Sequence, residues 1–169
     1  MENKTVEATF TLKSNDLGGQ FTKKHFGIGP DCQGGNISPE LHWENAPAGT
    51  KSFAVTMYDL DAPTGSGLWH WVVYNIPVSV TSLPADAGNL TAGQLPQGAI
   101  GGLSDLGVRG YYGPCLPAGQ LHRYIITVHA LREQLEDAEN SSAAIIGFML
   151  NMHTIEKASL LVYAQQEGK

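Results

Sequence analysis

Five stretches of the chain show the patterns of hydrophobic positions that β-strands produce. Residues 7–12 alternate between apolar and polar side chains, 51–58 follow a turn that contains Pro and Gly, and 69–76 form a nearly continuous aromatic and β-branched run. Residues 123–130 and 159–164 are apolar in a similar way. The run at 69–76 is typical of a central strand that is buried on both faces.

Helical periodicity is clear in one place. The polar residues at 140–142 can cap a helix, and apolar positions follow at helical spacing up to His153. A second, shorter helix is predicted around residues 132–139. The predicted architecture is therefore mainly β, with antiparallel sheets and one or two short peripheral helices, in a single domain that covers residues 1–169.

The periodic pattern disappears between residues 83 and 122. This segment holds nine of the twenty glycines and four of the nine prolines. A disordered insertion would explain such a composition. The adjacent Tyr111 and Tyr112, followed by Gly113 and Pro114, instead favour an ordered functional loop, because long loops in compact domains often carry function.

The charge of the chain limits its partners. Sixteen Asp and Glu residues against ten Lys and Arg leave a net charge of −6, which argues against nucleic acid because phosphate neutralisation requires a basic face. The sequence contains no apolar run long enough to span a bilayer. Its first seven residues lack the apolar core of a signal peptide, so we expect a cytoplasmic protein; a periplasmic or exported protein is the alternative if a signal has been removed.

The two cysteines leave the redox compartment open. Cys32 and Cys115 lie 83 residues apart and form no CxxC motif of a redox or zinc site. Their spacing is compatible with two buried thiols, or with one disulfide that closes a long loop in an oxidising compartment.

Several common catalytic motifs are absent from the sequence: the P-loop, GxGxxG, HExxH, GxSxG and the EF-hand loop. Polar residues at the ends of apolar strands remain as candidates. Asp59 and Asp61 follow the strand at 51–58, with Pro63 at the turn, and their side chains point the same way if the extended conformation continues. The alternative is a solvated turn in which the carboxylates cap backbone N–H groups.

A histidine between two tryptophans begins the central strand. Alternation predicts that His70, Val72 and Tyr74 share one face of this strand. Trp69 and Trp71 then lie on the other face. Burial lowers the pKa of a histidine, whereas a nearby carboxylate raises it by about 1–3 units. His70 is either a ligand-binding group or a core histidine that one hydrogen bond satisfies.

The third candidate group enters the strand at 123–130. His122 and Tyr124 share one face, and Arg123 takes the other. The alternative is a loop that enters a strand with ordinary polar residues. We expect structural or surface roles for the remaining histidines, which are His25, His42, His129 and His153.

Two aspartates, two histidines and a tyrosine in one pocket are compatible with three functions. Histidine and aspartate are ordinary metal ligands, but no local spacing defines a coordination geometry. An aspartate that orients a histidine forms the acid–base pair of many hydrolases. Imidazole N–H and tyrosine O–H groups can also bind an anion. No serine or threonine lies beside these residues in a recognisable setting, which disfavours covalent catalysis.

The order of the motifs adds a resemblance to a known family. From Phe10 to about Ala164 the chain resembles the phosphatidylethanolamine-binding protein family, also called Raf-kinase-inhibitor-like proteins, and its last segments look like the bacterial and archaeal branch. The motifs that carry this resemblance are NISPEL (36–41), PAGTKSF (47–53), DLDAPTGSG (59–67), WHWVVYNIP (69–77), GPC (113–115) and HRY (122–124).

The resemblance implies an antiparallel β-sandwich with a shallow anion pocket at one end. The ligand-binding residues that it implies are Asp59, Asp61, Pro63, His70, Gly113, Pro114, His122 and Tyr124. Two positions depart from the family pattern: Leu60 replaces the first proline of Asp-Pro-Asp-Ala-Pro, and Leu116 separates two prolines that are usually adjacent. Relatives with cysteines near these motifs look like the exported ones, which favours a Cys32–Cys115 disulfide.

We therefore expect a non-catalytic binding module that recognises a phosphate-like anion, carried by a phosphorylated headgroup, a small phosphoester or a phosphoprotein. The resemblance also allows a kinase or protease inhibitor and a homodimer. We expect no cofactor, no metal, no nucleic-acid partner and no membrane-spanning segment. The alternative is an Asp/His-based hydrolase that acts on a small ester or phosphoester.

Overall fold

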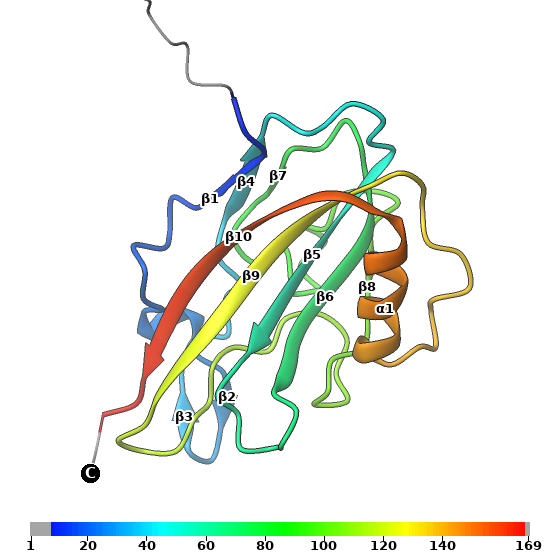
Figure 1. Cartoon of the computed structure of the whole chain (residues 1–169). Helices are drawn as coiled ribbons and strands as arrows, with labels where there is room; N and C mark the ends of the chain where they lie inside the picture. The colour runs from blue at the N-terminus through cyan, green and yellow to red at the C-terminus, as the bar shows by residue number, and fades with distance from the viewer. Residues whose placement is uncertain (1–7, 168–169) are drawn as a thin grey trace, which may run out of the picture.

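The computed structural model describes residues 8–167. Its strands are β1 (Thr11–Lys13), β2 (Ile28–Gly29), β3 (Cys32–Gln33), β4 (Leu41–Glu44), β5 (Ser52–Asp59), β6 (Leu68–Pro77), β7 (Ser82–Leu83), β8 (Ile100–Gly101), β9 (Leu121–Leu131) and β10 (Thr154–Gln165). They form a five-stranded antiparallel sheet in the order β10–β9–β5–β6–β8, a three-stranded one in the order β1–β4–β7, and the hairpin β2–β3 (Figure 1).

The larger hydrophobic core lies between the two sheets. Leu41 and Trp43 contribute to it from β4, and Phe53, Val55 and Trp71 contribute from the five-stranded sheet. A smaller apolar cluster lies on the outer face of the five-stranded sheet, beneath the helix α1 (Ala143–His153). The predicted mainly β fold with antiparallel sheets is therefore confirmed.

The predicted strands and the main helix are found with shifted boundaries. β5, β6 and β9 cover the three central stretches, and β10 begins at Thr154, before the predicted start at 159. β1 includes only the end of the stretch at 7–12, and residue 7 lies outside the described residues. Ser142 caps α1 as expected, since its hydroxyl accepts the Ile145 N–H at 3.3 Å.

The second predicted helix, around 132–139, is wrong. These residues form turns and irregular backbone between β9 and α1. The Asn75 side chain accepts the Leu135 N–H at 2.8 Å and donates to the Leu135 carbonyl at 2.9 Å. A side chain from β6 thus satisfies the backbone groups that a helix would otherwise pair. Besides α1, the described residues contain one short 3₁₀ helix, η1 (Lys23–His25). No helix among residues 8–167 is long and apolar enough to cross a membrane.

β6 carries an extra residue at two points in its pairing with β5, one opposite the step from Phe53 to Val55 and one opposite the step from Met57 to Tyr58. Met57 is opposite Trp71, but the next residue, Tyr58, is opposite Trp69. His70 therefore has no partner on β5. An extra residue of this kind forms a β-bulge, which bends the strand and re-aims its side chains.

The bulge at His70 changes which side chains share a face of β6, so the predicted assignment of faces is wrong. Val72 and Tyr74 belong to the outer cluster beneath α1. His70 instead packs against Tyr124 in the inner core, with ring centroids 5.2 Å apart. Trp69, predicted to lie opposite Val72, packs against the outer cluster with it. Simple alternation fails at this point because two residues of β6 occupy the space of one on β5.

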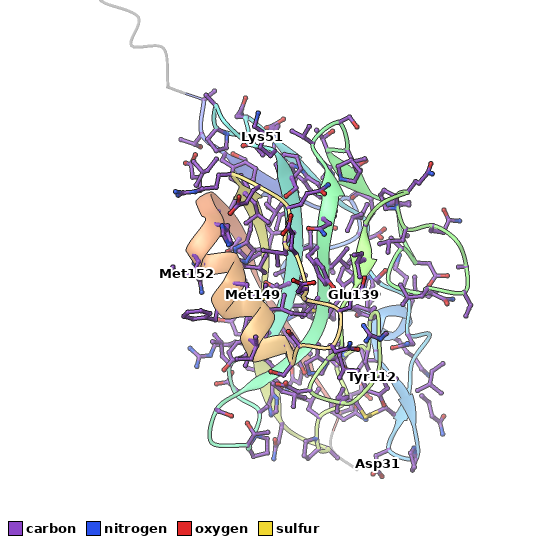
Figure 2. All side chains as sticks on the ribbon, turned by 90° about the vertical axis from the view of Figure 1, so that its right-hand side faces the viewer. Asp31, Lys51, Tyr112, Glu139, Met149 and Met152 are labelled. Carbon is purple, nitrogen blue, oxygen red and sulfur yellow. A yellow bond between two sulfur atoms is a disulfide. The ribbon has the colours of Figure 1, made fainter. Side chains whose placement is uncertain are left out.

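The long segment from 83 to 122 returns along β6 at the end of the molecule where β5 finishes. Gly102 donates its N–H to the Val72 carbonyl at 2.8 Å, and Tyr112 donates to the His70 carbonyl at 3.2 Å. Figure 2 shows Tyr112 toward the end of the molecule that carries Asp31, away from Lys51. A Cys32–Cys115 disulfide joins β3 to this segment.

Candidate functional site

Four buried polar side chains gather where β5 ends and where β6 and β9 begin, at the lower end of the sheet in Figure 1. They are Asp59, His70, His122 and Tyr124, with exposed fractions of 2%, 3%, 5% and 1%. We call them the buried polar cluster. Asp59 and Tyr124 are direct neighbours in the β5–β9 register, so the Asp59 carboxyl and the Tyr124 phenol point to the same inner face.

Asp59 orients His122. The carboxylate Oδ2 lies 2.8 Å from Nδ1 of the ring, and Oδ1 accepts the backbone N–H of Asp61 at 2.9 Å. The other ring nitrogen, Nε2, lies 2.9 Å from Oε1 of Gln120. Asp59 thus sets the direction in which the imidazole faces, and the exposed Gln120 side chain covers its second nitrogen.

His70 has one satisfied and one unsatisfied ring nitrogen. Nδ1 lies 2.8 Å from the Tyr112 carbonyl, and since a carbonyl only accepts, Nδ1 carries the proton. Nε2 is buried and has no hydrogen-bond partner among the described residues. Burial lowers the pKa of His70, although the Tyr112 carbonyl and the charge of Asp59 act in the opposite direction. Around neutral pH the ring is therefore uncharged, and Nε2 presents a lone pair.

Tyr124 supplies a phenol beside both rings. Its ring meets His70 edge-to-face, and it meets Phe21 in the same way with centroids 5.4 Å apart. Burial raises the pKa of Tyr124, and the charge of Asp59 adds to this effect. The phenol consequently keeps its proton throughout the neutral range and remains a hydrogen-bond donor.

Asn36 holds the loop that crosses the cluster. Its side-chain carbonyl accepts the Gly113 N–H at 2.8 Å, and its amide group donates to the Tyr111 carbonyl at 3.3 Å. The Pro114 carbonyl accepts the N–H of Gly27 at 2.9 Å. A Cβ at position 113 would collide with the backbone at His25, so only glycine permits this close approach.

The side chains of Asp61 and Pro63 are not buried with the four members of the cluster, although the backbone N–H of Asp61 contacts Asp59. Asp61 binds the Arg123 guanidinium through both oxygens, at 3.0 Å from Nε and 2.8 Å from Nη2. This pair lowers the pKa of Asp61 to about 2. Pro63 is exposed in the turn. The two carboxylates diverge because β5 ends at Asp59, so the extended conformation that would align them does not continue.

The two departures from the family pattern have clear structural settings. Leu60 donates its backbone N–H to the Arg123 carbonyl at 3.0 Å, a hydrogen bond that proline could not make. Leu116 is buried in the inner core beside the disulfide. Leu60 therefore anchors the turn to β9 with a backbone hydrogen bond.

Two hollows lie at this end of the molecule. His122 lines an open depression of about 470 Å³ together with Asp61, Gln120 and Arg123. A larger hollow of about 940 Å³ lies beside the disulfide, and none of the eight predicted residues lines it. Its wall includes Phe21, which contacts Tyr124. We place the candidate site at the buried polar cluster, because chemistry depends on convergent polar groups more than on volume.

Sequence reasoning missed Asn36 and Gln120. Asn36 stands in the NISPEL motif, but its positive φ of 50° and its contact with Gly113 depend on a loop far along the chain. Gln120 lies two residues before His122, the spacing that puts side chains on one face of a strand, and that spacing was a usable signal. Within residues 8–167, no group of three His, Cys, Asp or Glu side chains is arranged to hold a metal ion.

Comparisons with known proteins agree with the motifs. Residues 11–165 match the family model described as phosphatidylethanolamine-binding protein. The UPF0098 protein YbcL of Escherichia coli is 49% identical over 157 residues, covering 90% of this chain and 86% of that protein; YbhB of the same organism is 47% identical over 153 residues, covering 88% and 96%. The crystal structure of E. coli YbcL, described as a new member of the mammalian PEBP family, superposes with a TM-score of 0.90 at 46% identity, over 95% of this chain and all of that one.

Proposed function

Because this chain belongs to the phosphatidylethanolamine-binding protein family, we propose that it binds a phosphate-like anion at the buried polar cluster and catalyses no reaction. The observation that carries this proposal is Nε2 of His70, a buried polar atom without a partner. An unpaired buried polar group costs about 1–3 kcal/mol, which a ligand that bonds to it would recover.

The groups around His70 suit an anion whose binding is accompanied by the uptake of a proton on the imidazole ring. An anion next to the ring favours the charged imidazolium, so binding would place a proton on Nε2 and convert it into a donor. Tyr124 supplies a second donor, and a protonated His122 would supply a third once Gln120 moves aside. Asp59 orients His122 through Nδ1, and both of its carboxylate oxygens already have hydrogen-bond partners, in His122 and in the backbone N–H of Asp61. Since the chain carries −6, attraction of the anion depends on these local donors.

Calorimetry with inorganic phosphate and with phosphoethanolamine tests the proposal. We expect the wild type to bind both and His70→Ala to bind at least about tenfold more weakly, as the loss of a charged hydrogen bond predicts. His42→Ala is the matched control, because His42 pairs with Glu40 at 2.7 Å on the other sheet. Equal binding by His70→Ala and wild type would overturn the proposal. Tighter binding of phosphoethanolamine than of phosphate would identify a headgroup as the source of the anion.

One contact favours an Asp/His hydrolase as the second candidate. The 2.8 Å contact between Asp59 and Nδ1 of His122 is the orienting half of an acid–base pair. However, Gln120 is the residue at Nε2, and no serine, threonine or cysteine among residues 8–167 hydrogen-bonds to His122. Turnover of a phosphoester or ester panel that Asp59→Asn abolishes would establish the hydrolase.

A protein target, a homodimer and an exported location extend the proposal. A phosphoprotein, such as a kinase, would present the same anion to the cluster.

The apolar side chains that α1 exposes, Ile145, Phe148 and Met152, would suit a homodimer, which sedimentation would detect. The Cys32–Cys115 disulfide supports an oxidising compartment, and fractionation of the producing cells would test that location.

A further inference from the structure

A small hollow lies on the opposite face of the five-stranded sheet from the buried polar cluster. It measures about 180 Å³ and lies between α1 and strands β5, β6, β9 and β10. Figure 2 shows α1 against this side of the sheet, with Met149 and Met152 labelled on it. A cavity of about 150 Å³ accepts benzene, so the hollow has room for one aromatic ring with a short substituent.

The walls of the hollow are flat and apolar. Tyr58 and Trp69 pack with ring centroids 4.6 Å apart, and Ile125 and Leu150 complete the apolar lining. The Tyr58 hydroxyl donates to the Ser66 carbonyl, which fixes that ring. Gly147 of α1 leaves room for Trp69, since a Cβ there would lie 3.3 Å from the indole. These walls are already formed and suit the faces of a single ring.

His129 lines the hollow with a hydrogen-bond acceptor. Only 6% of the His129 residue is exposed, and its Nδ1 lies 3.2 Å from the Thr154 hydroxyl oxygen. The Thr154 hydroxyl donates its own proton to the Leu150 carbonyl at 2.7 Å, so its oxygen can only accept from Nδ1. Burial lowers the pKa of His129 to about 4, and Lys157 contributes to this. Neutral His129 therefore leaves a lone pair on Nε2, which no described residue contacts by a hydrogen bond.

Lys157 supplies a cation at the edge of the hollow. It is the register partner of His129 across the β9–β10 pair, so the two side chains share the outer face. Its Nζ donates to the Asn151 side chain at 3.2 Å. Among residues 8–167 no carboxylate forms an ion pair with Lys157, so its charge is available to an external carboxylate.

We propose that this hollow binds a small hydroxy acid that carries an apolar ring. The ring lies between Trp69 and Leu150, the carboxylate meets Lys157, and the neighbouring hydroxyl donates to Nε2 of His129. The adjacency of Lys157 and His129 calls for the hydroxyl and the carboxylate on neighbouring ligand atoms. The lysine charge selects against a ligand whose donor is an ammonium group. This site does not depend on the proposed anion site, which lies on the inner face.

A titration with three related probes tests the proposal, read out by amide shifts of the ¹⁵N-labelled protein. Mandelate has the ring, the hydroxyl and the carboxylate; phenylacetate lacks the hydroxyl; and benzyl alcohol lacks the carboxylate. We expect mandelate to bind most tightly and to shift the amides of Gly147, Ile125 and Lys157. Equal binding of mandelate and benzyl alcohol, or shifts confined to other parts of the protein, would overturn the proposal.

Two charge-matched variants sharpen the result. Lys157→Gln should weaken mandelate binding about three- to fivefold, the upper range for an exposed ion pair, and leave benzyl alcohol unchanged. Lys13→Gln removes the same charge from the other sheet, where Lys13 pairs with Glu44, and should change nothing. In His129→Leu, which has no acceptor for the ligand hydroxyl, mandelate should bind no better than phenylacetate. Equal loss in Lys13→Gln and Lys157→Gln would show a general charge effect and contradict the site.

Discussion

Two buried histidines on opposite faces of one sheet have similar hydrogen bonds and different surroundings. His70 faces the inner core and His129 the outer face beneath α1; each donates from Nδ1 to an oxygen, and neither has a described partner at Nε2. The charge of Asp59 favours the protonated form of His70, whereas Lys157 disfavours that of His129. Burial lowers the pKa of both histidines, and the neighbouring charges then oppose this shift at His70 and add to it at His129.

The largest expected effect is a loss of folding stability at acidic pH that His129 causes. Its pKa is about 4 when folded and 6.5 when unfolded, so only the unfolded state gains a proton between these values. Above pH 6.5 the group contributes nothing, and as the pH falls to 4 the free energy of unfolding drops by about 3 kcal/mol. In His129→Gln this part of the loss should vanish, as urea unfolding at several pH values would measure.

His25, whose pKa burial also lowers to about 4, should cause a similar loss in both proteins, so the difference between them isolates His129. Identical pH curves for His129→Gln and wild type would show that folding does not lower the pKa of His129.

The second prediction separates the two aspartates. Asp59→Asn should weaken phosphate binding about 10- to 100-fold, because the charged partner of His122 is lost. Asp61→Asn should change it less than about threefold, since Asp61 pairs with the exposed Arg123. Calorimetry on the two variants measures both effects. Comparable losses would mean that the outer ion pair takes part in binding.

The third prediction follows the proton on His70. Sulfate, whose charge stays constant near neutral pH, should bind up to about tenfold more tightly for each unit by which the pH falls, because one proton is taken up with the anion. The groups whose charges act on His70 are Asp59, Asp105 and His122, and Tyr124 packs on its ring. His70→Gln should flatten this dependence. A wild-type affinity that does not change with pH would contradict proton uptake.

The smallest effect is expected at Gln120. Gln120→Ala removes the group that covers Nε2 of His122, so the anion no longer has to displace it and should bind about two- to tenfold more tightly. Gln134→Ala, a change of another exposed glutamine, should leave the affinity unaltered. Weaker phosphate binding in Gln120→Ala would indicate instead that the amide contacts the ligand.

The sequence predicted much of the fold and the members of the buried polar cluster. Continuous apolar runs identified β5, β6 and β9, and the polar residues at 140–142 identified the start of α1. The motifs brought Asp59, His70, His122 and Tyr124 together in one proposed pocket, and the structure places these four side chains together. That they bind a ligand stays a prediction.

Other features could not be predicted because they depend on distant contacts. The segment at 132–139 has helical composition, but the Asn75 side chain pairs with its backbone. Asp61 turns toward Arg123 because β5 ends two residues earlier. The role of Asn36 depends on a loop that lies far along the chain.

By itself, the sequence determined the long strands β5, β6 and β9 and the polar residues at their ends, because these properties follow from local periodicity. The tertiary structure alone decided the face on which His70 lies. Its bulge exists only in the pairing of β6 with β5, where Trp69 and Trp71 match consecutive residues and His70 is left over. That one unpaired residue moves His70 from the outer face to the inner cluster, since pairing between strands overrides alternation within a strand.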